Sequence, residues 1–160
     1  MVTARNATTP RDGGPLRFSE WMDALRTLSR TRAARSEEAE RLRSALEVRV
    51  QRYDVAGGGG GGDGMEALIE AEEEDSAAEA VWKLGCDVAM QVIWRDDRSV
   101  AMAVGPREAW AVHSVYVDAE DAVQVASDLG VDDAELSAML SATMRRMDAD
   151  GWRLPRLPAF

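Results

Sequence analysis

Apolar residues recur at helical spacing between residues 18 and 56. Ser19 can cap the start of one helix, and Ser36 followed by Glu37 can begin a second one. Spacings of three, four and seven residues predict a helical arm over 18–56, either as two short helices or as one bent helix. The apolar positions on the face of this arm include Trp21, Leu25, Leu28, Leu42 and Leu46.

Glycine fills six consecutive positions after the arm, 57–62. Glycine has no side chain to bury and loses the most backbone entropy on ordering, so we predict a flexible linker at 57–64. The run also matches the Gly-x-Gly-x-x-Gly spacing of dinucleotide-binding loops, but any six glycines match it, and no further strand–helix unit follows. A helical segment is expected to open at Met65, and Ser76 with Glu79 forms a capping box for a helical piece that Gly85 ends. The acidic stretch 70–75 lies between these two pieces and should be solvated.

Beyond Gly85 the apolar period changes from that of a helix to that of a strand. Apolar residues alternate with smaller or more polar ones over 88–94, and again over 100–104 after a turn at 96–99. A glycine–proline pair breaks the pattern before a third alternating stretch over 110–117. The sequence therefore predicts a three-stranded antiparallel meander.

Two further helices are expected near the end of the chain. The first covers 119–129 and ends at Gly130, and the second is capped by Asp132 and ends at Gly151. The second helix has a face rich in methionine, which adapts to irregular surfaces, so this face either packs on the sheet or meets a partner. The methionines are Met139, Met144 and Met147.

Together these elements predict an α+β fold: a helix, a three-stranded antiparallel meander and two C-terminal helices, preceded by a helical N-terminal arm. Five segments are expected. They are a flexible tail at 1–17, a basic helical arm at 18–56, a glycine linker at 57–64, an acidic α+β domain at 65–151 and a proline-containing C-terminal tail at 152–160.

The C-terminal tail allows two interpretations. Its prolines favour an extended left-handed helix, so the tail resembles a proline-rich ligand that a partner protein could bind. Alternatively, Trp152, Leu154 and Phe160 fold back onto the domain. The candidate partner-binding residues of the tail are Trp152, Leu154, Pro155, Leu157 and Pro158.

Charge is distributed unevenly over the 160 residues, whose net charge is −10. Residues 1–53 hold eleven of the 19 basic and seven of the 29 acidic residues, a net of +4, which leaves eight basic and 22 acidic residues, a net of −14, in 54–160. A basic arm could meet an anionic partner, or arm and body could attract each other. The acidic body would repel nucleic acid, unless the body itself imitates nucleic acid and binds a protein that recognises nucleic acid.

Side chains with catalytic or metal-binding chemistry are sparse. One cysteine, Cys86, and one histidine, His113, can form neither an intramolecular disulfide nor a Cys/His zinc cluster within one chain. Aspartate pairs such as Asp148 and Asp150 are explained by turns and caps. No catalytic residue, cofactor site or metal site is predicted. A single cysteine, no apolar signal-peptide run and no membrane-length apolar stretch indicate the reducing cytoplasm and no contact with a membrane.

We therefore expect a noncatalytic protein-binding adaptor or regulator that acts through the helical arm and the acidic body, and not an enzyme. Its partner is another protein, or a second copy of the chain bound through the arm, while nucleic acid is disfavoured. Two alternatives stay open: an acidic inhibitor that mimics nucleic acid and blocks a nucleic-acid-binding protein, and, less favoured, a carboxylate-dependent metal enzyme. The candidate contact residues are Trp21, Leu25, Leu28, Leu42, Leu46, Met139, Met144, Met147, Trp152, Leu154, Pro155, Leu157 and Pro158.

Overall fold

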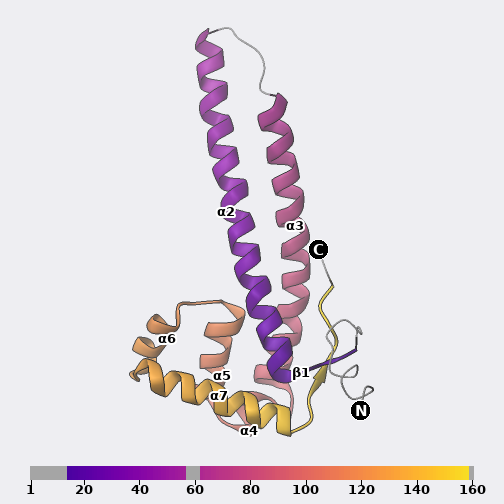
Figure 1. Cartoon of the computed structure of the whole chain (residues 1–160), viewed down its shortest axis with the longest axis vertical. Helices are drawn as coiled ribbons and strands as arrows, with labels where there is room; N and C mark the ends of the chain where they lie inside the picture. Colours follow the sequence, from indigo (N-terminus) through magenta and orange to yellow (C-terminus); the bar gives the residue numbers. More distant parts are fainter. Residues whose placement is uncertain (1–13, 57–61, 159–160) are drawn as a thin grey trace, which may run out of the picture.

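Two long helices rise side by side from a base of shorter helices (Figure 1). The computed structural model describes the backbone of residues 14–56 and 62–158, and the side chains of residues 14–48 and 64–158. The long helices are α2 (Phe18–Ala56) and α3 (Gly62–Met90), which pack against each other as an antiparallel hairpin. None of the described helices is both long and apolar enough to span a membrane.

The base contains short helices and a minimal sheet. Strand β1 (Leu16–Arg17) pairs antiparallel with β2 (Arg153–Leu154), with Leu16 opposite Leu154, and so joins the two ends of the described chain. The helices and π-helical turns that follow α3 are η2 (Gln91–Arg95), α4 (Val100–Ala103), α5 (Pro106–Val112), η3 (His113–Val117), α6 (Ala122–Leu129) and α7 (Asp133–Ala149).

The predicted α+β fold with a three-stranded meander is wrong, because the described chain is mostly helical and its sheet is the two-stranded pair β1–β2. The first predicted strand, 88–94, belongs to the end of α3 and to η2. Its buried residues are Ala89, Val92 and Ile93, at spacings of three and four. That spacing fits one helical face, and the apparent alternation arose because apolar residues also occupy the neighbouring positions.

The second and third predicted strands form α4, α5 and η3. Pro106 does not end an element but starts α5. Proline is tolerated there because the backbone amides of the first helical turn have no acceptor within the helix, so the missing amide hydrogen costs no hydrogen bond. Over 110–117 apolar residues surround the helix on most sides, and Ala111, Val112 and Val115 are fully or almost fully buried. A short, continuously apolar stretch has no period that separates a buried helix from a buried strand.

Helix α2 is one continuous helix, which is one of the two arrangements that the pattern allowed. It begins at Phe18, one residue before the predicted cap. Ser19 lies inside the helix, and its backbone amide donates to Asp148 Oδ1 of α7 at 2.9 Å. Glu20 accepts a hydrogen bond from the backbone amide of Arg17 at 3.1 Å. Asp148 of α7 and Glu20 of the first turn itself therefore satisfy two of the amides at the start of α2.

Gly85 lies inside α3 and does not end it, contrary to the expectation from sequence. A Cβ atom built on Gly85 would lie 2.7 Å from Leu25 Cδ1 of α2, closer than real Cβ contacts allow. The glycine is therefore used for close packing of α2 against α3. Two helix caps lie where the sequence indicated. Asp132 at the start of α7 accepts a hydrogen bond from the Glu135 amide at 2.7 Å, and Gly130 at the end of α6 has the left-handed backbone conformation.

The core lies where the lower part of the hairpin meets the base. Phe18, Trp21, Met22 and Leu25 of α2 are fully buried there, so the N-terminal half of the expected arm is part of the core. A smaller apolar cluster joins α5 and η3 to α6 and α7 around Val115. Of the predicted tail and linker, 1–13 and 57–61 lie outside the described residues, and the domain boundaries stay predictions.

Candidate functional site

Charges of opposite sign face each other across the two helices of the hairpin. Arg43 of α2 contacts Glu72 of α3 at 2.9 Å, and Arg32 of α2 lies 3.6 Å from Glu79 of α3. These pairs join basic residues from the N-terminal part of the sequence to acidic residues that follow the glycines. The uneven charge distribution is thus partly explained by attraction between the arm and the helix that follows it, which was one of the two interpretations.

A polar cluster ties the middle of the hairpin to the base. The guanidinium of Arg32 lies over the ring of Trp82, 4.4 Å from its centroid. Trp82 Nε1 donates to Ser29 Oγ at 2.9 Å, and Ser29 Oγ donates in turn to the backbone carbonyl of Val117 in η3 at 2.8 Å. Because η3 belongs to the base, this chain of contacts links the base to both long helices.

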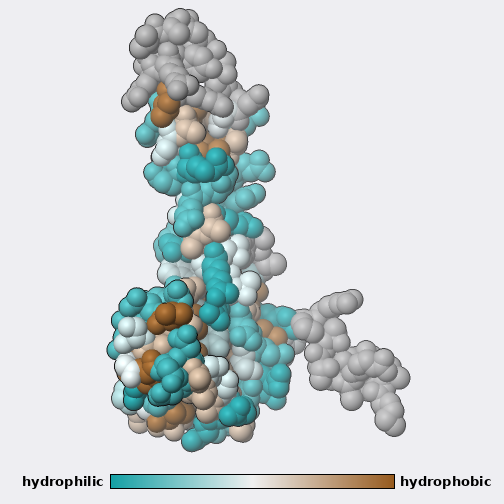
Figure 2. Space-filling view, turned by 60° about the vertical axis from the view of Figure 1, so that its left-hand side comes forward, coloured by the Kyte–Doolittle hydropathy of each residue, from teal (hydrophilic) through white to brown (hydrophobic). Residues whose placement is uncertain are grey.

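Above this cluster the described hairpin has little buried apolar surface. Among the side chains of 33–48 and 64–77, Ala39 and Leu68 alone are buried. Three large apolar side chains are solvent-exposed here: Val48 is 48% exposed, Met65 46% and Ile69 49%. The space-filling view shows apolar surface beside polar surface just below the grey tip (Figure 2). We call the hairpin at 33–48 and 64–77 the distal hairpin.

Helix α3 carries a row of acidic side chains in the distal hairpin. Glu66, Glu70, Glu73 and Glu74 are exposed, and no ion pair joins any of them to another described residue. Between residues 64 and 82 the sequence of α3 contains no basic residue. The outer side of α3 therefore keeps its negative charge, whereas the side facing α2 is partly neutralised by Arg32 and Arg43.

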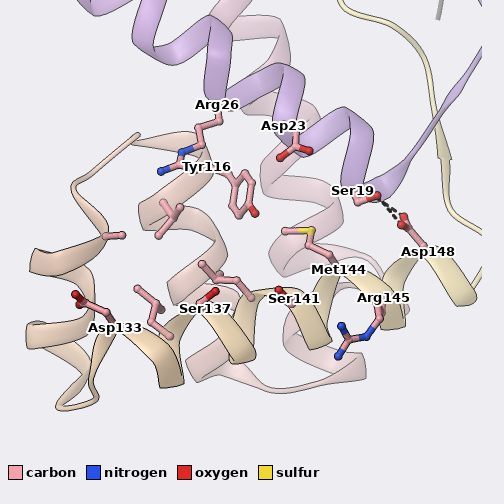
Figure 3. Close-up of a pocket in the computed structure, with 14 residues that line it drawn as sticks. Ser19, Asp23, Arg26, Tyr116, Asp133, Ser137, Ser141, Met144, Arg145 and Asp148 are labelled. Carbon is pink, nitrogen blue, oxygen red and sulfur yellow. Dashed lines mark hydrogen bonds between the residues drawn. The ribbon is translucent and has the colours of Figure 1, made fainter. Parts of the chain in front are cut away.

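The base contains a groove of about 530 Å³ between the start of α2, η3, α6 and α7 (Figure 3). Val115, Leu136, Leu140 and Met144 supply its apolar surface, while serines, aspartates and arginines supply its polar surface. The groove combines apolar and polar lining of a size that could hold a small molecule or part of a peptide. Its polar residues are Ser19, Asp23, Arg26, Tyr116, Asp133, Ser137, Ser141, Arg145 and Asp148.

The titratable groups of this groove lack an arrangement for nucleophilic catalysis. Burial raises the pKa of Asp23 and of Tyr116, and Arg26, whose guanidinium lies 5.7 Å from the Tyr116 ring centroid, opposes both shifts. The hydroxyl of Ser19 donates to Asp148 Oδ2, so this carboxylate also helps to hold the start of α2. No histidine or cysteine lies among the lining residues that the structure describes.

Cys86 and His113 lie apart from the groove. Burial, and after it the charges of Asp118 and Asp87, raise the pKa of the Cys86 thiol to about 11 against a smaller opposing effect of Arg32. The thiol is therefore protonated and a poor nucleophile near neutral pH. His113 belongs to a π-helical turn and not to a strand, and its Nδ1 accepts from Trp94 Nε1 at 3.4 Å. Within the described chain, no group of three or more histidine, cysteine or acidic residues is arranged to hold a metal ion.

Comparison of the chain with protein-family models, curated proteins and solved structures gives no match. Its candidate function therefore rests on geometry.

The structure separates the predicted contact residues of α2. Trp21 and Leu25 are fully buried and Leu28 is 6% exposed, so a partner could reach them only if the core opened. Leu42 and Leu46 are half-buried in the distal hairpin. Of the first five candidates, these two leave part of their surface accessible beside the exposed Val48 and Ile69.

The methionines of α7 lie in two places. Met147 is fully buried and Met144 is 8% exposed in the main core, where Met144 also lines the groove. Met139 is half-buried and packs against the smaller cluster. The methionine face thus packs chiefly inside the protein, with Met144 at the edge of a surface feature.

The C-terminal tail folds back onto the base as far as Pro158. Trp152 packs on the Phe18 ring at 6.3 Å between centroids, and Leu154 lies in the sheet. Trp21 Nε1 donates to the carbonyl of Pro155 at 3.1 Å. Leu157 is half-buried and Pro158 exposed, and Phe160 lies outside the described residues. This is the fold-back arrangement, which leaves less of the tail free than a ligand would need.

Val48, Met65 and Ile69 were missed as candidate contact residues. Met65 and Ile69 had a signal, because two apolar residues four positions apart lie on one face of a helix. The sequence alone could not show that this face points away from α2, since Leu68 between them is the residue that packs inward.

Proposed function

We propose that this chain is a noncatalytic protein-binding adaptor or regulator that docks a partner through its distal hairpin. One observation carries the proposal: Val48, Met65 and Ile69 each expose about half of their surface at a place where only two helices lie together. Two packed helices cannot cover an apolar face on their outer side, so a partner helix or sheet is needed to bury it.

The energy available at this surface suits reversible association. Fully burying an aliphatic or methionine side chain contributes about 1.5–3 kcal/mol, and roughly half of that remains to be gained at each of these three half-exposed residues. The costs of association reduce the total, so polar contacts would have to add to the affinity. An adaptor or regulator that binds and releases its partner fits such a surface.

The proposal is tested by affinity capture with the full chain as bait. Replacing Met65 and Ile69 together by serine (M65S/I69S) should abolish capture of the partner that the unchanged chain retains. The matched control is M102S/V123S, because Met102 and Val123 are also exposed, at 70% and 59%, but lie in the base. Equal helical circular dichroism of both variants would show that they fold alike. Capture that survives M65S/I69S, or that is lost in the control alone, would contradict the proposal.

The acidic inhibitor that imitates nucleic acid remains a second candidate, favoured by the unpaired row Glu66, Glu70 and Glu73 on α3. It requires a partner that itself binds nucleic acid. An excess of duplex DNA or of RNA should displace the chain from such a partner, and added salt should weaken the complex steeply. The variant M65S/I69S separates the two candidates. An inhibitor that acts by charge alone would keep its partner, whereas an adaptor that also buries Met65 and Ile69 would lose it.

A further inference from the structure

We propose that the outer face of α3 in the distal hairpin binds a basic amphipathic helix of a partner protein. This inference rests on the proposed docking function and adds the chemistry of the occupant. It combines two features of the same helical face. An apolar pair indicates that a helix docks there, and an acidic row beside the pair indicates that this helix is basic.

The apolar pair is Met65 and Ile69, one helical turn apart and about 6 Å along the axis. Both expose almost half of their surface, whereas Leu68 beside them is buried against α2. The pair is thus a short apolar strip on the side of α3 that α2 does not cover. A strip of this spacing matches the apolar positions of a second helix laid along it.

The acidic row is Glu66, Glu70 and Glu73, spaced by four and three residues and therefore aligned along α3 next to the apolar strip. Each is exposed, and none is neutralised by another described side chain. Two arginines of α2, Arg43 and Arg32, instead contact Glu72 and Glu79 on the side of α3 that faces α2. A partner that buries the strip must therefore place positive charge beside it.

A second copy of this chain does not supply that charge. Two copies joined by a twofold axis through this face would set Glu66, Glu70 and Glu73 of one copy against the same residues of the other, and like charges opposite each other are destabilising. The described side chains of α2 in the distal hairpin do not offer a free basic row either, because Arg41 contacts Glu38 and Arg43 contacts Glu40. The occupant is therefore a different protein whose helix has lysine or arginine beside leucine-like residues.

A synthetic peptide tests the occupant directly. The probe is a fluorescent helical peptide of about 18 residues, five turns, with leucine along one face and lysine beside it. Its partner probe has glutamate in place of every lysine. We expect the full chain to increase the anisotropy of the lysine peptide and not of the glutamate peptide, and high salt to weaken the complex. Equal binding of both peptides, or of neither, would overturn the proposal.

Two charge variants separate this face from general acidity. E66Q/E70Q/E73Q should bind the lysine peptide about tenfold more weakly than the unchanged chain, since three close charges are lost. The control D97N/E120Q/D128N removes the same number of charges from exposed positions of the base and should bind as the unchanged chain does. Equal weakening in both variants would show attraction by net charge alone and would overturn the proposed face.

The apolar strip is tested with the same peptide. M65S/I69S should also weaken its binding about tenfold, and unchanged binding would overturn the amphipathic match.

Sedimentation of the free chain gives an independent result, because a dimer lost in M65S/I69S would make a second copy the occupant. If M65S/I69S abolishes capture of a natural partner while the peptides fail, the basic helix is wrong and docking by the hairpin stands. If capture is unchanged, the proposed function itself fails.

Discussion

The base and the distal hairpin are built on the same two helices but differ in how many neighbours cover them. In the base, α2 is enclosed by α3, η3, α7 and the C-terminal segment, and four large side chains from Phe18 to Leu25 are fully buried. In the distal hairpin the same helix meets α3 alone, and Ala39 is its one described residue that is buried. Burial within one helix is therefore set by the number of packed layers, which assigns stability to the base and leaves apolar surface of the distal hairpin exposed.

The sharpest test of this difference replaces leucine by alanine at two places in α2. L25A should lower the free energy of unfolding by about 2–5 kcal/mol, because Leu25 is fully buried and its loss leaves a cavity. L42A should lower it by about 1 kcal/mol, since Leu42 is half-buried and water can fill the space. Urea denaturation followed by circular dichroism measures both. Equal losses would show that the distal hairpin is as well packed as the base.

Cys86 of α3 reports on burial near the base through its reactivity. With a pKa of about 11 instead of the ordinary 9.0, its thiolate fraction near neutral pH is about a hundredfold smaller than that of a free cysteine. Alkylation by iodoacetamide should be slower by a similar factor and should keep rising tenfold per pH unit up to pH about 10. A rate that levels off near pH 9 would contradict the assigned environment.

The raised thiol pKa also has a consequence for stability. The unfolded thiol ionises at lower pH than the folded one, so the folded state binds the proton more tightly. The contribution of this thiol to the free energy of unfolding should therefore be fully present below pH about 9 and should be lost as the pH rises from 9 toward 11. The variant C86S, measured in parallel, should lack this part of the pH dependence.

Asp148 joins α7 to the start of α2, which lies in the base. D148A removes the acceptor of the Ser19 amide and hydroxyl and should lower the free energy of unfolding by about 1–2 kcal/mol. D148N keeps one side-chain oxygen as acceptor and should recover part of the loss. D97A is the control, because Asp97 is an exposed residue of a turn. A loss in D148A no larger than in D97A would contradict the capping role.

Local signals in the sequence were sufficient for several helix ends and insufficient for the middle of the chain. Asp132 and Gly130 specify backbone geometry by themselves, so the start of α7 and the end of α6 could be predicted. The start of α6 was placed too early, at 119, because its cap is Asp121. The stretch 88–117 could not be, because apolar residues occupy nearly every side of short, buried helices there. A proline such as Pro106 interrupts a strand but is favoured at the first turn of a helix, so it could not distinguish the two.

The candidate surface depended on information that no local pattern holds. The apolar spacing of Met65 and Ile69 is visible in the sequence, but their exposure results from the absence of a third layer above the cluster at Arg32 and Trp82. Trp21 and Leu25 show the converse, since the same kind of spacing is buried where the base covers it. A helical apolar face can form a core or an interface, and only the tertiary packing decides which.

The smallest expected effect concerns the ion pair that closes the distal hairpin. Arg43 and Glu72 lie 2.9 Å apart but are each more than 40% exposed, so water and salt screen their attraction. A double-mutant cycle of R43A, E72A and R43A/E72A should give a coupling free energy of about 0.2–1 kcal/mol at low salt and close to zero at high salt. In the base, by contrast, Leu25 acts through burial, and the effect of L25A should not change sign or vanish with salt. A coupling above about 2 kcal/mol that persists in salt would mean that the pair is shielded from water, and hence that the distal hairpin is covered in solution, contrary to the comparison with the base.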